Sequence, residues 1–208
     1  MNIVFSHQNK NTFLYVAEKI QHISKDDENR YIKSFEKDFY NSVHNSRKRE
    51  LLSVRKLLHT VFPHTQNIIQ YSENGKPHCS EYSISISHSG NYVAIICNPN
   101  TAVSIDIEEY RNVIEKTAHK FISEYEKKSF QTLEELTLVW SSKEVLYKLF
   151  EASANFLNDY TIEHTKHNLQ EHGELIGRVN TKKIDKTIKL EYFRSENFIV
   201  TWSIVDSK

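Results

Sequence analysis

Three short apolar segments, separated by turn residues, follow one another in the middle of this 208-residue chain. Residues 83–87 alternate serine and isoleucine, which is the period-two pattern of a half-buried strand. Residues 92–97 are almost wholly apolar and follow Gly90, so we expect these two segments to pair as a hairpin. A turn at Asn98–Asn100 then leads into a third predicted strand at residues 102–107. The pattern places an antiparallel arrangement of strands in the middle of the chain.

Helices and further strands are predicted on both sides of this region. The spacing of apolar residues indicates long helices at residues 42–62 and 133–150, and Ser24 followed by acidic residues marks the start of a shorter helix. A helix is also expected within residues 15–22, and one or two within residues 110–129. The remaining strands are expected at residues 3–5, 68–71, 160–164, 174–179, 188–193 and 198–204.

Each half of the chain therefore contains helices followed by antiparallel strands. The predicted fold class is α+β, with two similar lobes that each pack helices on a small antiparallel sheet. We expect an N-terminal lobe at residues 1–100 and a C-terminal lobe at residues 101–208.

Composition and charge limit the classes of partner. Charged residues make up 26% of the chain and hydrophobic residues 38%, as in a globular protein. The 27 basic residues are balanced by 27 acidic ones, so the chain lacks the basic excess of a nucleic-acid-binding protein, and we expect no nucleic-acid partner. No apolar run approaches the roughly 20 residues of a membrane span, so no membrane association is expected. Cys79 and Cys97 match no metal-binding spacing and are expected to be buried free thiols in a reducing cytoplasm.

Two acidic residues lie close together on the third predicted strand. Asp106 and Glu108 are two residues apart, so their side chains share one face, while Ile105 and Ile107 take the other face toward the core. Two carboxylates at this separation repel each other unless a cation or protons neutralise them. A hard metal ion, most naturally Mg²⁺, is one interpretation. Taken alone, the pair is more readily interpreted as two solvated acids at a strand end.

A mixed stripe of side chains lies along the second long predicted helix. Trp140, Lys143, Glu144, Tyr147 and Lys148 occupy positions i, i+3, i+4, i+7 and i+8, which form one face. An aromatic residue combined with both signs of charge is unusual for a plain core face. The alternative is an exposed Glu144–Lys148 pair, worth about 0.3–0.5 kcal/mol, beside a tryptophan that only packs.

Two more polar motifs precede these. Gly75, Lys76 and Pro77 form a predicted turn, and His88 lies after Ser87 at a strand end. Each alone is explained by a hairpin turn or a solvated histidine. Their occurrence together with the other two motifs, in this order, favours a phosphate and metal site.

The four motifs together resemble the 4'-phosphopantetheinyl transferases of the larger, surfactin-synthetase-activating type. That family has a G-K-P turn, an (N/S)-I-S-H-S strand end, a G-(I/V)-D-(I/V)-E strand and a W-x-x-K-E-x-x-x-K helix. This chain reads G-K-P from Gly75, I-S-H-S from Ile86, S-I-D-I-E from Ser104 and W-S-S-K-E-V-L-Y-K from Trp140. The resemblance extends over most of the chain.

The resemblance implies a pseudodimeric α+β enzyme with its active site in the cleft between two lobes. The implied reaction transfers the 4'-phosphopantetheine arm of coenzyme A to a serine of an apo acyl or peptidyl carrier protein, with release of 3',5'-ADP. It implies Mg²⁺ bound by Asp106, Glu108 and Glu144, and we expect a monomer.

The resemblance also implies roles for further residues. Glu126, with Glu124 as the competing register, would be the general base, and Glu144 and Lys148 would complete the catalytic set. The residues implied to bind coenzyme A are Arg49, Gly75, Lys76, Pro77, Ser87, His88, Lys143 and Lys148.

Two features differ from the family pattern. Ser104 replaces the glycine before I-D-I-E, and the family's glycine-rich segment after the long helix is replaced by residues 151–157. The second difference leaves the choice of carrier protein open. A non-catalytic module of the same fold, which holds coenzyme A or a carrier protein, is the alternative function.

Overall fold

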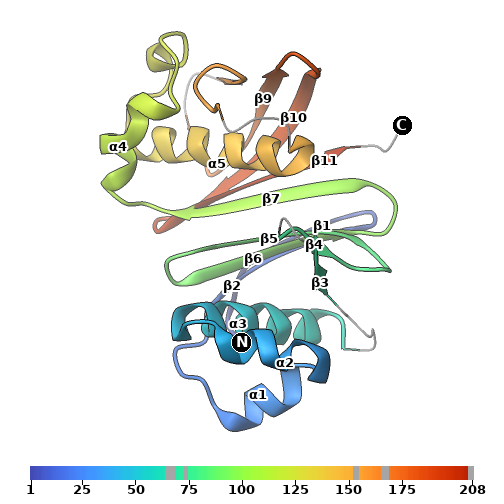
Figure 1. The fold of residues 1–208 in the computed structure, drawn as a ribbon. Helices are drawn as coiled ribbons and strands as arrows, with labels where there is room; N and C mark the ends of the chain where they lie inside the picture. The colour runs from blue at the N-terminus through green and yellow to red at the C-terminus, as the bar shows by residue number, and fades with distance from the viewer. Residues whose placement is uncertain (64–68, 73–74, 152–154, 165–168, 206–208) are drawn as a thin grey trace. The chain divides into compact units, whose positions relative to one another are not determined.

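The computed structural model describes residues 1–63, 69–72, 75–151, 155–164 and 169–205. These residues form five α-helices and eleven strands in an α+β arrangement with antiparallel sheets (Figure 1). The chain divides into two compact units, Met1–Pro99 and Asn100–Lys208. Among the helices of the described residues, none has both the length and the apolar character needed to cross a membrane.

The first unit contains a four-stranded antiparallel sheet with the strand order β1-β2-β6-β5. The predicted hairpin is confirmed, because β5 and β6 pair directly, with Ile86 opposite Ile95. The bounds of the strands are β1 Ile3–Asn9, β2 Thr12–Glu18, β5 Ser83–Ser89 and β6 Tyr92–Asn98, and a separate short ribbon is made by β3 Gln70–Tyr71 and β4 Pro77–His78.

The helices of the first unit are α1 (Lys25–Tyr31), α2 (Lys37–Ser42) and α3 (Asn45–Val61). Ser24 caps α1 as predicted, since its hydroxyl accepts the backbone N–H of Asp27 at 3.1 Å. The long helix α3 packs on the sheet through an apolar face, which explains its position. The buried residues of this cluster include Val54, Leu57, Leu58, Ile84, Val93 and Ile95.

The predicted helix at residues 15–22 is wrong. Residues 12–18 are strand β2, which pairs with β1 on one side and β6 on the other. The spacing of Val16, Ile20 and Ile23 fits a helix, but only Val16 belongs to the sheet and the other two follow it. Pairing on both edges therefore overrides a local pattern that suits either structure.

The second unit contains a five-stranded antiparallel sheet with the order β7-β11-β10-β9-β8. Its longest helix, α5 (Leu133–Phe150), has the predicted bounds and begins with a capping box between Thr132 and Glu135. The predicted helices within residues 110–129 shrink to α4 (Val113–Thr117) and short 3₁₀ turns. The strands are β7 Ala102–Glu109, β8 Tyr160–His164, β9 His172–Asn180, β10 Asp185–Arg194 and β11 Phe198–Val205.

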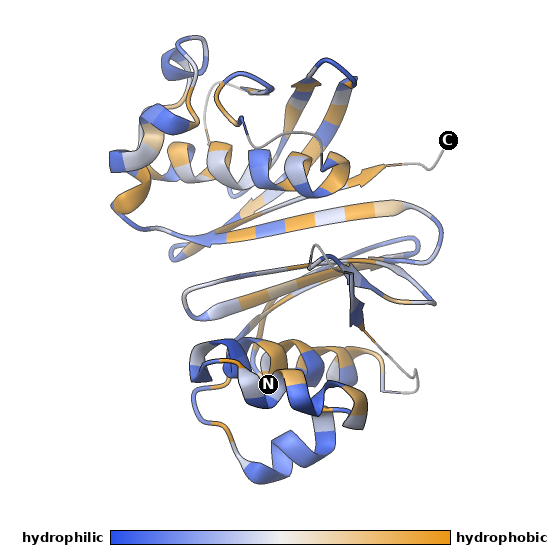
Figure 2. Cartoon of the chain, viewed as in Figure 1, coloured by the Kyte–Doolittle hydropathy of each residue, from blue (hydrophilic) through white to orange (hydrophobic). Residues whose placement is uncertain are grey.

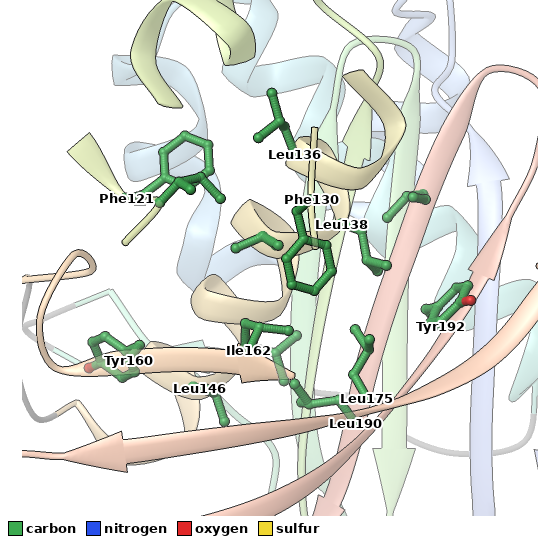
Figure 3. Close-up of a cluster of buried hydrophobic side chains, with 14 of the residues drawn as sticks. Phe121, Phe130, Leu136, Leu138, Leu146, Tyr160, Ile162, Leu175, Leu190 and Tyr192 are labelled. Atoms are coloured by element: carbon green, nitrogen blue, oxygen red, sulfur yellow. The ribbon is translucent and has the colours of Figure 1, made fainter. Parts of the chain in front are cut away.

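Helix α5 covers one face of this sheet and fixes a hydrophobic core against it (Figures 1 and 3). Leu138 and Leu146 of the helix belong to the same buried cluster as Leu175, Leu190 and Tyr192 of the strands. Each of these side chains is at most 3% exposed. The core of the second unit thus lies between α5 and the sheet.

Strand β7 alternates between polar and apolar residues (Figure 2). The polar face is turned toward α5: Ser104 Oγ donates to the carbonyl oxygen of Val145 at 3.0 Å, and Asp106 lies beside the end of the helix. Ile105 and Ile107 occupy the opposite face and are fully buried, as predicted. The acidic residues of β7 are therefore held under the helix that carries the third predicted acid.

Candidate functional site: a carboxylate cluster and a cationic pocket

Asp106 on β7 is linked to Lys148 on α5. The ammonium group of Lys148 lies 2.7 Å from Asp106 Oδ1 and donates a second hydrogen bond to the carbonyl oxygen of Ile105 at 3.1 Å. The Asp106 side chain is 5% exposed, whereas Lys148 keeps 28% of its side chain exposed. A buried carboxylate and a partly exposed cation thus join the strand to the last turns of the helix.

Glu108, two residues further along β7, is held by two donors. Trp140 donates its indole N–H to Glu108 Oε1 at 3.1 Å, and Arg111 donates to Oε2 at 2.9 Å. The indole ring is itself fixed by edge-to-face contacts with Phe121 and Phe156, at centroid distances of 5.2 and 5.3 Å. The aromatic residue of the helix stripe therefore orients one of the acids of the strand.

Glu144, the third predicted acid, lies on α5 between Trp140 and Lys148. Burial, together with the charges of Asp106 and Glu108, raises the pKa of Glu144 to about 7, although the charge of Lys148 acts in the opposite direction. The charges of Asp106 and Glu108 therefore act on Glu144, and near neutral pH Glu144 is protonated in part.

The carboxylate cluster, Asp106, Glu108 and Glu144, fits a hard divalent cation in the type of its donors, because Mg²⁺ prefers carboxylate oxygens. Within the described part of the chain, however, no three acidic, histidine or cysteine side chains already converge as a metal site. Asp106 faces Lys148, and Glu108 faces Trp140 and Arg111. An entering cation would therefore replace Lys148 and Arg111 as the partner of the acids.

Glu126 and Lys143 pair with each other in the interior of the second unit. Both side chains are fully buried, and Lys143 Nζ lies 2.8 Å from Glu126 Oε2. In this position Lys143 presents no ammonium group to a phosphate, and Glu126 presents no oxygen to a substrate hydroxyl. The competing residue Glu124 is largely exposed and pairs with Lys127.

A cationic pocket occupies the first unit. Its volume is about 290 Å³, and Arg49, predicted to bind coenzyme A, lines it. Lys19 and Glu50, which carry opposite charges, also line the pocket. The other residues that line it are Ile20, Gln21, Ser46, Gly90 and Asn91.

His88 at the end of β5 joins this charged group through Glu50. Its Nε2 atom lies 2.9 Å from Arg47 NH1 and 3.3 Å from Glu50 Oε2, while Lys19 Nζ lies 3.6 Å from Glu50 Oε1. Burial raises the pKa of Glu50, but the hydrogen bond from Arg47 and the charges of His88 and Lys19 outweigh it, so the pKa is lowered overall. Glu50 thus remains a carboxylate at the centre of several cations.

The G-K-P motif forms a turn, as predicted. The backbone N–H of Gly75 donates to the carbonyl oxygen of Ser72 at 2.8 Å, and Gly75 has a φ of 79°, a conformation that favours glycine. Pro77 pairs with Tyr71 in the β3–β4 ribbon. Lys76 is exposed and is not part of the pocket lining, and Asn74, the residue before this motif, lies outside the described residues. Ser87, the other predicted coenzyme A contact, is buried in β5.

Lys19, Arg47 and Glu50 are charged residues that the sequence analysis did not identify. Lys19 was placed inside the predicted helix at residues 15–22, whereas it directly follows β2 and its backbone N–H donates to Asn91 at 2.7 Å. Recognising residues 12–18 as a strand would have placed Lys19 at its end, beside a loop. Arg47 and Glu50 are one helical turn apart and give no signal beyond that of a surface pair.

The raised pKa of Glu144 predicts a pH-dependent stability of the metal-free protein. The folded state holds this proton up to about pH 7, whereas the unfolded chain releases it near 4.5. The contribution of Glu144 is therefore most favourable below pH 4.5 and is lost as the pH rises to about 7, by roughly 2–3 kcal/mol at most. The Glu144→Gln variant lacks this loss. Urea unfolding in EDTA at pH 5 and pH 8 measures it as the difference between the two proteins, and a difference that stays constant with pH contradicts the prediction.

Comparison of the chain with models of known protein families and with curated proteins finds no match in either case.

Proposed function

We propose that this chain is a Mg²⁺-dependent 4'-phosphopantetheinyl transferase that modifies a serine of an acyl or peptidyl carrier protein. The observation that carries the proposal is the carboxylate cluster, in which Glu144 interacts electrostatically with Asp106, Glu108 and Lys148. These acids belong to two separate motifs, and the coupling of their charges supports the shared role that the motifs predict.

Asp106, Glu108 and Glu144 would hold the metal ion. When bound, Mg²⁺ supplies Lewis-acid activation and neutralises the charge of a diphosphate. Glu144 would give up its proton as the cation enters, because its raised pKa arises partly from the neighbouring carboxylates. Lys148, displaced from Asp106, would be the cation nearest the cluster and would offset the negative charge on the leaving group.

The cationic pocket of the first unit is the place we assign to the 3'-phosphate of coenzyme A. Arg49 lines it together with Lys19, and His88 and Arg47 adjoin it through Glu50. Arginine suits this role because its guanidinium group donates two parallel hydrogen bonds to a phosphate. Lys76, on its exposed turn, is the further cation that the G-K-P motif suggests.

In the proposed reaction, the serine oxygen of the carrier forms a bond to the β-phosphorus of coenzyme A. The bond from that phosphorus to the bridging oxygen breaks, and 3',5'-ADP leaves with this oxygen. Since Glu126 is buried and hydrogen-bonded, we assign the hydroxyl proton to a water molecule rather than to this carboxylate. The chain's own contribution is then to position the substrates and stabilise charge.

A repeated topology supports the related proposal of two similar lobes. In the first unit, β2 precedes α3 and pairs with β6, the last strand, which in turn pairs with β5. In the second unit, β7 precedes α5 and pairs with β11, again the last strand, which pairs with β10. The same order of a strand, a long helix and a closing hairpin is therefore present twice, which favours a pseudodimer.

The proposed transfer is tested by the intact mass of an apo acyl carrier protein after incubation with this protein, coenzyme A and Mg²⁺. We expect a gain of one phosphopantetheine arm that EDTA abolishes. Asp106→Asn and Glu144→Gln should each lower the rate at least about 100-fold, because each removes a charged metal ligand. The matched control is Glu174→Gln, which removes an exposed acid outside the cluster and should transfer normally.

Two outcomes would contradict this proposal. Full activity of folded Glu144→Gln would remove the metal role of the carboxylate cluster. A folded protein that binds coenzyme A but modifies none of several apo carrier proteins would favour the non-catalytic binding module.

The assignment of the 3'-phosphate predicts a selective effect of Arg49→Ala. Loss of a charged hydrogen bond to phosphate costs about 1.5–3 kcal/mol, so KM for coenzyme A should rise about 10- to 100-fold. KM for dephospho-coenzyme A, which lacks that phosphate, should change little. Steady-state kinetics with both substrates measures the contrast, with the exposed Arg178→Ala as the control. Equal increases in KM for the two substrates would show that Arg49 does not bind the 3'-phosphate.

A further inference from the structure

A buried ion pair joins Glu126 to Lys143, the residue that precedes Glu144 on α5. Lys143 Nζ donates to Glu126 Oε2 at 2.8 Å and to the carbonyl oxygens of Phe121 and Phe156 at 2.6 and 2.9 Å, so its three protons are all engaged. Glu126 in turn accepts the backbone N–H of Ile162 on β8 at 2.8 Å through Oε1. Neither side chain is exposed.

Ser123 completes the set of bonds around Glu126. Both its backbone N–H, at 2.9 Å, and its hydroxyl, at 2.8 Å, donate to Glu126 Oε2. The carboxylate thus accepts four hydrogen bonds, from Ser123 twice, from Ile162 and from Lys143. A group that is buried and bonded in this way is poorly placed to accept a proton from a substrate, which a general base must contact.

We propose that Glu126 and Lys143 form a positioning pair that orients two of the acids of the carboxylate cluster. The effect on catalysis rests on the proposed function, whereas the positioning role follows from the contacts of Lys143 and Glu126. The pair reaches Glu144 through the helix and Glu108 through Trp140.

The first path follows the helix. Lys143 and Glu144 are adjacent, so their side chains leave α5 about 100° apart. When Lys143 is tied to Phe121, Phe156 and Glu126, the helix cannot rotate about its own axis without breaking those bonds. The position of Glu144 around the helix axis is thereby fixed.

The second path passes through the aromatic side chains. Phe121 and Phe156, whose carbonyl oxygens bind Lys143, are the residues whose rings pack against Trp140. Trp140 in turn donates to Glu108. Moving the ammonium group of Lys143 would therefore free Phe121 and Phe156, whose rings hold the Trp140 indole. The indole N–H that donates to Glu108 would then lose its fixed position.

The experiment compares Glu126→Gln, Lys143→Met and the double variant Glu126→Gln/Lys143→Met. Each single change leaves one buried charge without its partner, which typically costs about 3–5 kcal/mol, whereas the double change removes both charges. The first measurement is the indole ¹H–¹⁵N resonance of Trp140, assigned by its disappearance in Trp140→Phe. It needs neither metal nor turnover.

We expect the Trp140 resonance to move in Lys143→Met and in the double variant, because both lose the hydrogen bonds from Lys143 to Phe121 and Phe156, and to move less in Glu126→Gln, which keeps them. Mn²⁺ serves as the probe of the carboxylate cluster, with affinity measured well below the melting temperature of each variant. Affinity should fall about 10- to 100-fold in Lys143→Met and in the double variant, as when the outer-shell partners of metal ligands are lost, and less in Glu126→Gln. Transfer to the carrier protein should fall in the same order.

Each other result overturns the inference in a recognisable way. If Glu126 is the general base, Glu126→Gln keeps the Mn²⁺ affinity and the Trp140 resonance of the wild type and is inactive. If the pair serves stability alone, the single variants melt earlier while the Trp140 resonance and Mn²⁺ affinity stay unchanged. A wild-type protein that transfers nothing refutes the proposed function, whereas the Trp140 resonance still decides the positioning role.

A milder variant covers the case in which the single variants do not fold. Ser123→Ala removes one hydrogen bond to Glu126 and leaves both charges of the pair in place. We expect a displaced Trp140 resonance and a Mn²⁺ affinity reduced severalfold. If neither changes, the link from Glu126 to the carboxylate cluster is refuted.

Discussion

The contact between helix α5 and strand β7 is the interaction on which the second unit depends. The contact of α5 with β7 is polar and joins Asp106 to Lys148, whereas the contact of α5 with the strands from β8 to β11 is apolar and builds the core. Both kinds of contact come from the same helix, so the core fixes the rotation that the polar groups need. The packing of α5 thus determines both the stability of the second unit and the placement of the candidate site residues.

The polar edge is held by charges that compensate each other without a ligand. Lys148 forms an ion pair with Asp106, and Arg111 forms one with Glu108. The third acid, Glu144, is partly protonated near neutral pH. Such a cluster is only partly neutralised, which is unfavourable in itself and favours the entry of a cation. The cationic pocket shows the reverse arrangement, because Glu50 there accompanies several positive groups.

Much of the fold was predictable because local patterns were strong. The long amphipathic helix α5 and strand β8 have the predicted bounds, and the β5–β6 hairpin follows from an alternating strand and a glycine turn. Strand β2 was missed because its apolar residues also fit a helical spacing, and only pairing with distant strands decides between the two. Helix content within residues 110–129 was overestimated for a similar reason, since that segment is fixed by packing rather than by periodicity.

The candidate site was predictable in part. Asp106 and Glu144 were found together because their motifs are distinctive, and a strand period of two gives the shared face of Asp106 and Glu108. No sequence pattern around Lys143 indicates that it is buried, because a lysine in a helix is normally solvated. Its partner Glu126 lies 17 residues away, and the bond depends on backbone carbonyl groups that no motif records. Buried charges of this kind become visible only with the tertiary structure.

Ser104 has a consequence for how far this region of the protein can vary. The residue is 1% exposed, and its hydroxyl meets the backbone of α5 at Val145. It therefore acts as a spacer whose thickness sets the height of the helix above the sheet, and with it the reach of Lys148 to Asp106. A bulkier residue here would act as a wedge and separate the two elements. The space between β7 and α5 therefore limits this position to small side chains, whatever ligand the neighbouring residues hold.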